Sequence, residues 1–238
     1  MKHPTMLALA GCLALSHAAS GAPTVVIDPG HGGSNSGAQS RGFQEKHLTL
    51  SIANQVAARL RDRAINVELT RTTDRTMTLR QRVAVADQRV ADLFVSIHAN
   101  ASELRTQQGF ETYVLTPRAV DIDGRALRSD TTTTRPGIDP EIALVLDDVE
   151  RGSSQWEAAE LASKIQRALR ERRGERLNRG VKQDSHHVLL GATMPAVLVE
   201  IGFIDHPIEG KQLADPAVQS AIADALAEAI ADQLSDAR

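Results

Sequence analysis

The stretch Val25–Gly33, VVIDPGHGG, is the one around which the rest of this sequence is organised. The four residues Thr24–Ile27 are all β-branched, which favours a strand buried on both faces. Asp28-Pro29-Gly30 ends that strand, because proline and glycine favour a turn. His31 is therefore predicted to lie on a tight loop at the carboxyl end of a buried strand, where open α/β sheets assemble their sites.

A helix is predicted to begin at Glu45. Apolar residues then recur every four positions along one helical face, at Leu48, Ile52, Val56 and Leu60. Glu45 consequently lies in the first turn, where the helix dipole favours a carboxylate even when no metal is bound.

The next elements alternate in type. A strand is predicted at Asn66–Thr70, a helix at Leu79–Val90 with its apolar face formed by Leu79, Val83, Ala86 and Val90, and a strand at Leu93–Ile97. Alternating strands and helices predict an α/β fold with a mostly parallel central sheet and helices on both faces. Residues 23–238 are expected to form a single domain.

His98 follows the strand Leu93–Ile97 directly. Right-handed crossovers bring the same ends of parallel strands together, so His98 and His31 are expected at one edge of the sheet. With Glu45 they form a His/Glu/His set of the kind that binds zinc and leaves a fourth position open. Asp28 is either a hydrogen-bond partner for one of these histidines or a turn residue.

Glu200 lies inside the apolar run Pro195–Phe203, PAVLVEIGF. Burying a carboxylate costs several kcal/mol unless it is hydrogen-bonded, paired or close to a cation. Glu200 is therefore expected to serve a purpose there, and the alternative is an edge position that faces solvent. A functional Glu200 would supply the base that a metallohydrolase needs to take a proton from water.

The composition excludes several classes of protein. Cys12 is the single cysteine, so neither a disulfide framework nor a cysteine-ligated metal site is expected. A net charge of −3 and a hydrophobic content of 42% give no indication of disorder or of nucleic-acid binding. No segment after the N-terminal region approaches the roughly 20 apolar residues of a transmembrane helix.

Residues 1–22 have the pattern of an export signal. Lys2 and His3 precede the apolar run Met6–Leu15, and small residues follow in Ser16–Ala22. The mature chain is therefore expected in the periplasm or the cell envelope. Leu9-Ala10-Gly11-Cys12 also resembles a lipobox, which leaves open a lipid anchor on Cys12.

Six segments together resemble the zinc-dependent type 3 family of N-acetylmuramoyl-L-alanine amidases: VVIDPGHGG, Glu45 at its helix start, LTRTTDRTMTLRQRVAVAD, ADLFVSIHAN, GFETYVL and GVKQDSHHVLLGATMPAVLVEIGFIDHP. The resemblance implies a zinc ion on His31, Glu45 and His98, and Glu200 as the catalytic glutamate. It implies hydrolysis of the amide between N-acetylmuramic acid and L-alanine in peptidoglycan. We expect the chain to act as a monomer.

Two other functions stay open at this point. His206-Pro207-Ile208-Glu209 has the His and Glu spacing of a zinc carboxypeptidase, although its proline favours a turn. A peptidoglycan-binding module without catalysis is the second alternative, and the presence of all four site residues argues against it.

Residues 116–154 are interpreted as an insertion with a regulatory role. GFETYVL before it is predicted to be a strand, and 156–170 after it a helix. Within the insertion, Asp139 as N-cap, Pro140 and Glu141 begin a second predicted helix that ends at Glu150, with its apolar face formed by Ile142, Val145, Leu146 and Val149. This helix resembles one that plugs the active site of cell-division amidases until an activator with a LytM-type domain withdraws it. By that resemblance Glu141 is the candidate zinc contact. The alternative is a surface helix without a regulatory role.

Overall fold

The computed structural model describes residues 21–40, 42–117, 140–185 and 188–236, with the side chains of residues 140–150 described only in part. Residues 1–20 of the expected leader, with Cys12 among them, and the N-cap Asp139 lie outside the described residues. The elements follow one another as β1 (Thr24–Pro29), β2 (Gln39–Ser40), β3 (Phe43–Gln44), α1 (Glu45–Arg61), β4 (Asn66–Leu69), α2 (Leu79–Gln88), β5 (Leu93–Asn100), β6 (Phe110–Leu115), α4 (Pro140–Arg173), η1 (Glu175–Leu177), β7 (Asn178–Asp184), β8 (Ala196–Phe203), α5 (Glu209–Leu213) and α6 (Pro216–Asp236).

Six strands form the central sheet in the order β4-β1-β5-β8-β6-β7. The strands β4, β1, β5 and β8 are parallel to one another, whereas β6 is antiparallel to β8 and β7 is parallel to β6. The prediction of a mostly parallel sheet is confirmed. The sequence analysis did not predict β7, because NRGVKQD contains a glycine and a single apolar residue.

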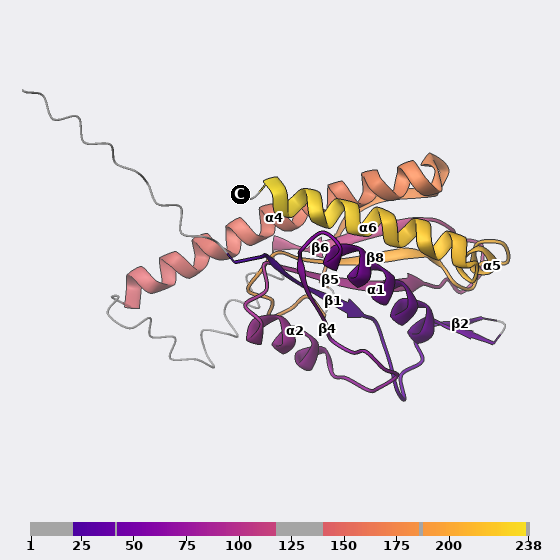
Figure 1. The fold of residues 1–238 in the computed structure, drawn as a ribbon, viewed down its shortest axis with the longest axis horizontal. Helices are drawn as coiled ribbons and strands as arrows, with labels where there is room; N and C mark the ends of the chain where they lie inside the picture. Colours follow the sequence, from indigo (N-terminus) through magenta and orange to yellow (C-terminus); the bar gives the residue numbers. More distant parts are fainter. Residues whose placement is uncertain (1–20, 41, 118–139, 186–187, 237–238) are drawn as a thin grey trace, which may run out of the picture.

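Helices cover both faces of this sheet (Figure 1). One face carries α1, α4 and α6, which bury a large aliphatic cluster against β1, β5 and β8. The other face carries α2 and a smaller cluster that includes Val26, Phe94 and Leu198. In β1, Val25 and Ile27 belong to the first cluster and Val26 to the second, so both faces of the strand are covered. This explains why β1 is apolar without alternation.

The first two predicted helices are present. Helix α1 begins at Glu45, and its four predicted apolar positions are at most 1% exposed. Helix α2 begins with a capping box in which the Thr78 hydroxyl accepts from the Gln81 N–H and the Gln81 side chain accepts from the Thr78 N–H. It ends at Gln88, and Val90 beyond it is 85% exposed, so the prediction that Val90 belongs to the buried face was wrong.

Helix α4 is one continuous element of 34 residues, where the sequence analysis predicted two helices separated by a loop. Its second half packs in the core, with Leu161, Ile165 and Leu169 fully buried. In its first half Ile142 is 55% and Val149 63% exposed, so these two residues of the predicted apolar face do not pack in the core. Figure 1 shows this first half extending beyond the body of the protein.

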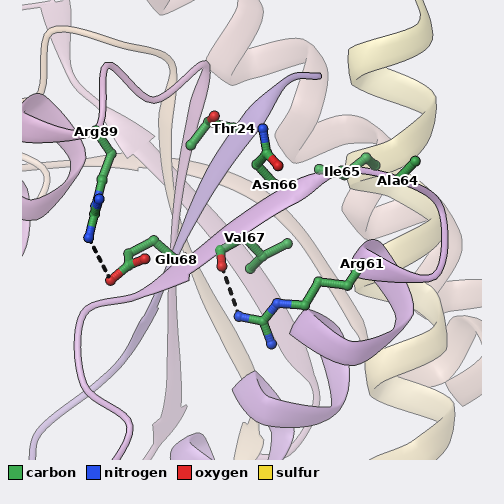
Figure 2. A pocket seen from close by; sticks show the side chains of 8 residues that line it. All are labelled: Thr24, Arg61, Ala64, Ile65, Asn66, Val67, Glu68 and Arg89. Carbon is green, nitrogen blue, oxygen red and sulfur yellow. Dashed lines mark hydrogen bonds and ion pairs between the residues drawn. The ribbon is translucent and has the colours of Figure 1, made fainter. Parts of the chain in front are cut away.

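A pocket of about 710 Å³ lies beside the edge strand β4 (Figure 2). The Arg61 guanidinium donates to the Val67 carbonyl (2.8 Å), and Arg89 pairs with Glu68 (3.5 Å). Charged side chains along an edge strand oppose pairing with a strand of another molecule. Thr24 and Asn66 in the lining place this pocket at the amino ends of β1 and β4, away from the strand ends that carry the predicted site.

Among the described helices, none combines the length and the apolar composition that a membrane-spanning helix requires.

The packing of α4 predicts a contrast between two positions on that helix. Leu161→Ala should lower the free energy of unfolding by about 2–5 kcal/mol, because truncating a fully buried leucine leaves a cavity. Trp156→Ala should change it by less than about 0.5 kcal/mol, because Trp156 is 81% exposed. Urea unfolding followed by circular dichroism measures both, and equal losses would contradict the packing described.

Candidate active site

His31 follows β1 on a loop that contacts the next strand of the sheet. The Gly30 N–H donates to the Ile97 carbonyl of β5 (2.9 Å). A Cβ at residue 30 would lie 2.4 Å from the His98 ring, so only glycine allows this approach. The His31 and His98 rings consequently meet edge to face, with their centroids 4.8 Å apart. His31 itself has φ of 60°, in the left-handed region that non-glycine residues seldom adopt.

Glu45, the first residue of α1, contacts both histidines. Its Oε1 lies 3.0 Å from His31 Nε2 and 3.0 Å from His98 Nδ1. Two backbone amides also donate to this carboxylate, Ala99 to Oε1 (3.0 Å) and Ala38 to Oε2 (2.8 Å). The structure thus brings together His31, Glu45 and His98, whose ligand atoms all lie within 4.8 Å of one another.

The charges within this cluster stabilise one another. Burial alone would raise the pKa of Glu45, but hydrogen bonds from His31 and His98 outweigh burial and hold that pKa far below its usual range. Burial lowers the pKa of His31, and the bond to Glu45 outweighs it and raises that pKa above its usual value. Glu45 is therefore ionised near neutral pH, as a metal-binding carboxylate has to be.

Two buried guanidinium groups attach the histidine loop to the sheet. Arg71 is fully buried, and it donates to the carbonyls of Pro29 (2.9 Å) and Gly30 (2.8 Å). Arg82 donates to the carbonyls of Pro29 (2.8 Å) and His31 (2.6 Å). Three consecutive carbonyls of the turn are thus hydrogen-bonded to charged donors, which fixes the direction in which His31 leaves β1.

Asp28, considered above as a partner for a histidine, has other partners. Its Oδ1 accepts from Arg82 (2.7 Å) and from the Thr70 hydroxyl (2.5 Å), and its Oδ2 accepts from the Ser96 hydroxyl (2.7 Å). Asp28 therefore supports the site through Arg82. The side chain that contacts the second ring nitrogen of His31 is Asn35, whose Oδ1 lies 3.0 Å from Nδ1.

Glu200 lies in β8, in register with His98 of β5 and with Glu111 of β6. Paired residues of neighbouring strands project from the same face of a sheet, so the three side chains form a row. The Oε2 atom of Glu200 is buried and has no hydrogen-bond partner among the described residues. Burial, together with the negative charges of Glu45 and Glu111, raises the pKa of Glu200 well above its usual value.

Glu111 was not predicted from the sequence as a site residue. Its carboxylate is 2% exposed and accepts from Asn100 Nδ2 (2.8 Å), the Tyr113 hydroxyl (2.8 Å) and Arg179 Nε (2.7 Å). The signal that drew attention to Glu200, a carboxylate within an otherwise apolar strand, is also present in FETYVL. Arg179 carried no such signal, because nothing in its surrounding sequence predicted that β7 would lie next to β6.

The pair His206 and Glu209 does not form a metal site in this structure. Glu209 is 1% exposed, accepts hydrogen bonds from the backbone amides of Gly109 and Phe203 (both 2.9 Å), and pairs with Arg173 (3.2 Å). Its carboxylate therefore joins α5 to the ends of β8 and α4. Among the described residues, the grouping able to hold a metal ion is His31, Glu45 and His98.

Glu141 lies in the first turn of α4, and its side chain is outside the described part of the protein. Gln155 of the same helix donates to the carbonyl of Leu115 (2.6 Å), the last residue of β6, which lies beside the amino end of the antiparallel strand β8. Arg173, the last residue of α4, donates to the carbonyl of Ile201 (3.2 Å), near the carboxyl end of β8. The helix therefore begins at the end of the sheet opposite to the histidine cluster. The structure does not bring the backbone of Glu141 to that cluster.

Comparisons with known proteins identify the family to which this chain is similar. The family described as N-acetylmuramoyl-L-alanine amidase matches residues 25–232. Over 208 residues the chain is 34% identical to the N-acetylmuramoyl-L-alanine amidase AmiA of Salmonella typhimurium, which covers 84% of this chain and 72% of AmiA. Over 218 residues it is 32% identical to the uncharacterized protein YqiI of Bacillus subtilis, which covers 92% of this chain and 87% of YqiI.

Solved structures give the same result. The crystal structure of an N-acetylmuramoyl-L-alanine amidase from Clostridium difficile has a TM-score of 0.70 at 28% identity, covering 91% of this chain and 98% of that one. The CwlD amidase of Clostridioides difficile, solved in complex with the GerS lipoprotein, has a TM-score of 0.71 at 25% identity, covering 90% of this chain and 98% of that one.

The fold is that of a cell-wall hydrolase that acts on an amide bond of peptidoglycan. Within that class, the chain belongs to the N-acetylmuramoyl-L-alanine amidase family.

The close contacts of Gly37 predict that a methyl group there would disturb the cluster. A Cβ at Gly37 would lie 2.4 Å from Glu45 Oε2 and 2.6 Å from the His31 ring, whereas a Cβ at Gly42 would meet nothing within 4 Å. Both glycines have positive φ, so either substitution by alanine carries backbone strain of roughly 1–2 kcal/mol. Only Gly37→Ala should also weaken the binding of a metal ion by the cluster, by about 10–100-fold.

Isothermal titration of metal-free protein with zinc measures this difference. An unchanged affinity in Gly37→Ala, or an equal loss in Gly42→Ala, would contradict the contact.

Proposed function

We propose that this protein is a zinc-dependent amidase that hydrolyses the amide between the lactyl group of N-acetylmuramic acid and the L-alanine of the stem peptide. In this proposal His31, Glu45 and His98 are the metal ligands and Glu200 is the general base. The observation that carries it is a set of three ligand atoms within 4.8 Å of one another, one strand away from a glutamate with a buried, unpaired oxygen.

The donor set suits zinc. Two imidazoles and one carboxylate are a common set of ligands in catalytic zinc sites, which keep one further position open. When bound, zinc supplies positive charge that makes a water molecule more acidic and polarises the scissile carbonyl. The protein prepares its ligands by hydrogen bonds: Ala38 and Ala99 donate to Glu45, and Asn35 contacts His31.

Glu200 transfers the protons. Its raised pKa makes the carboxylate a stronger base than an ordinary glutamate, which favours removal of a proton from the attacking water. The protonated Glu200 then gives that proton to the alanine nitrogen, and the C–N bond of the amide breaks with a neutral amine as leaving group. Adjacent strands are about 5 Å apart, so Glu200 is within reach of a reaction centre at His98.

Analysis of the reaction products separates this proposal from its two alternatives. Purified sacculi are incubated with the zinc-loaded protein, and the soluble products are identified by mass spectrometry. An amidase releases stem peptides that begin with L-alanine and leaves the glycan strands intact. Shortened stem peptides that stay attached to the glycan would indicate a carboxypeptidase, and absence of any product would indicate a binding module.

The roles of the four residues predict two classes of variant. His31→Ala and His98→Ala should lose bound zinc, because each removes a metal ligand. Glu200→Gln should retain zinc and lose about 10²–10⁴-fold in turnover, because an amide cannot accept the proton. Atomic emission of the purified variants and release of peptide from sacculi measure the two properties. Loss of zinc in Glu200→Gln would make that residue a ligand instead.

An envelope location follows from the substrate. Cell-wall amidases act outside the cytoplasm, so we propose that residues 1–22 direct export and that 23–238 form the catalytic domain. N-terminal sequencing of the exported chain tests this boundary. Lipid attachment at Cys12 would appear as membrane association that Cys12→Ser abolishes.

We also propose that residues 116–154 restrain the enzyme until a partner protein acts on them. Ile142 and Val149 are both exposed on the first half of α4, which supports this proposal. Exposed apolar side chains are suited to packing against another protein surface. The structural relative CwlD has been solved with the GerS lipoprotein, and the resemblance to cell-division amidases suggests an activator of LytM type here. Inhibition by Glu141 requires an arrangement different from the one described, in which α4 begins away from the cluster.

Removal of the segment tests this restraint. A variant without residues 119–150 should hydrolyse sacculi several times faster than the full chain, and Glu141→Ala should give part of that increase. Ile142→Ser combined with Val149→Ser keeps Glu141 and should also raise the rate, because these two side chains are proposed to pack elsewhere in the restrained enzyme. Equal rates in a folded, zinc-loaded deletion variant would contradict the restraint.

A further inference from the structure

A second cavity, of about 490 Å³, lies on the β6 and β7 side of Glu200. Its lining includes Glu111, which is in register with Glu200, and Phe203 at the end of β8. The remaining wall comes mainly from the loop that follows β5, with hydroxyl and amide side chains such as Ser102 and Gln107. The cavity therefore adjoins the row of side chains that begins at His98.

Arg179 is the cationic side chain that lines this cavity, and three contacts hold it in place. Its Nε donates to Glu111 (2.7 Å), its Nη2 donates to Gln107 (3.0 Å), and its guanidinium lies 5.0 Å from the centroid of the Phe203 ring. Stacking on an aromatic ring and a charged partner fix the plane of the guanidinium. Its Nη1 makes no hydrogen bond to the described residues and is available for a ligand.

Arg179 is one of several groups that compensate the negative charge of Glu111. Lys182 lies 3.6 Å from the same Oε2, and Asn100 and Tyr113 both donate to Oε1. Two cations therefore share one carboxylate. Glu103 is an exposed anionic member of the lining, and exposed charges are largely screened by solvent and salt. Ser102 Oγ, also in the lining, is buried and has no partner among the described residues.

The distance from the metal cluster fits a peptide. Glu111 lies two strands from His98, which is about 10 Å. Two extended residues span roughly 7 Å, so a stem peptide whose first residue lies at the cluster can place a carboxylate of its second residue near Arg179.

We propose that this cavity is a subsite for a carboxylate of the stem peptide, which Arg179 binds through its free Nη1. The hydrogen bond from a guanidinium to a carboxylate is charge-assisted, and amidation of the carboxylate removes both the charge and one acceptor. The subsite thus distinguishes peptides with a free carboxylate at the second residue from amidated ones. This inference rests on the proposed cleavage after the lactyl group, which sets where the peptide begins.

Two soluble substrates test the subsite: muramyl tripeptides identical except that the second residue carries a free or an amidated carboxylate. A hydrogen bond to a charged group contributes about 1.5–3 kcal/mol. The wild-type protein should therefore prefer the free acid by about 10–100-fold in kcat/KM, mainly through KM. Arg179→Met should remove the preference by raising KM for the acid and leaving KM for the amide almost unchanged.

Lys182→Met is the matched control. It removes the other cation beside Glu111 but does not line the cavity, so it should keep the preference for the acid. Circular dichroism and zinc content establish that each variant is folded and loaded. Binding of the released acid and amide peptides to Glu200→Gln, measured by titration calorimetry, should show the same preference in the absence of turnover.

Two results would overturn the subsite. One is a wild-type enzyme that cleaves acid and amide equally well, and the other is an Arg179→Met variant that loses activity on both to the same degree, which would assign Arg179 to the support of Glu111. Failure of the wild-type enzyme to cleave either substrate after the lactyl group would instead reject the proposed function. The two failures are thereby distinguished.

Discussion

The hydrogen bonds from two buried arginines to the turn after β1 are the interaction on which the active site depends. Within the described part of the chain no carboxylate pairs with Arg71, and it donates to the carbonyls of Pro29, Gly30 and Lys46. It thus joins the histidine loop to the first turn of α1, where Glu45 lies. A buried guanidinium is costly unless its donors are used, so these bonds specify one arrangement of the loop and the helix. Arg82 adds the bond to the carbonyl of His31 and links it to Asp28.

The row of side chains across β5, β8 and β6 places His98, Glu200 and Glu111 at one edge of the sheet. Glu111 has four donors around it and Glu45 has two imidazoles and two amides, whereas Glu200 between them has an unpaired oxygen. Like charges and burial disfavour ionisation of the unpaired member, which makes it the group suited to exchange a proton. Burying an unpaired carboxylate near like charges is electrostatically unfavourable. Perturbed pKa values of this kind cluster at functional sites in proteins.

Local patterns in the sequence were enough to predict β1, α1, α2 and β5, because each carries its own periodicity or cap. The convergence of His31 and His98 could be predicted from the handedness of parallel connections. The continuity of α4 could not, because Arg151 to Ser154 gives no helical pattern, yet the helix runs through it from 140 to 173. Glu111 and Arg179 were missed because their pairing depends on β6 and β7 lying side by side, which is a long-range contact.

X-ray absorption at the zinc edge tests the central claim most directly, because it reports the atoms bound to the metal. For the zinc-loaded protein the account predicts two imidazole nitrogens and carboxylate oxygen at about 2.0–2.2 Å. It predicts the same spectrum for Glu200→Gln, and for His98→Ala it predicts a protein without bound zinc and hence no zinc spectrum. A spectrum that changes in Glu200→Gln, or that is unaffected by His98→Ala in a protein that still binds zinc, would contradict the assignment of ligands and base.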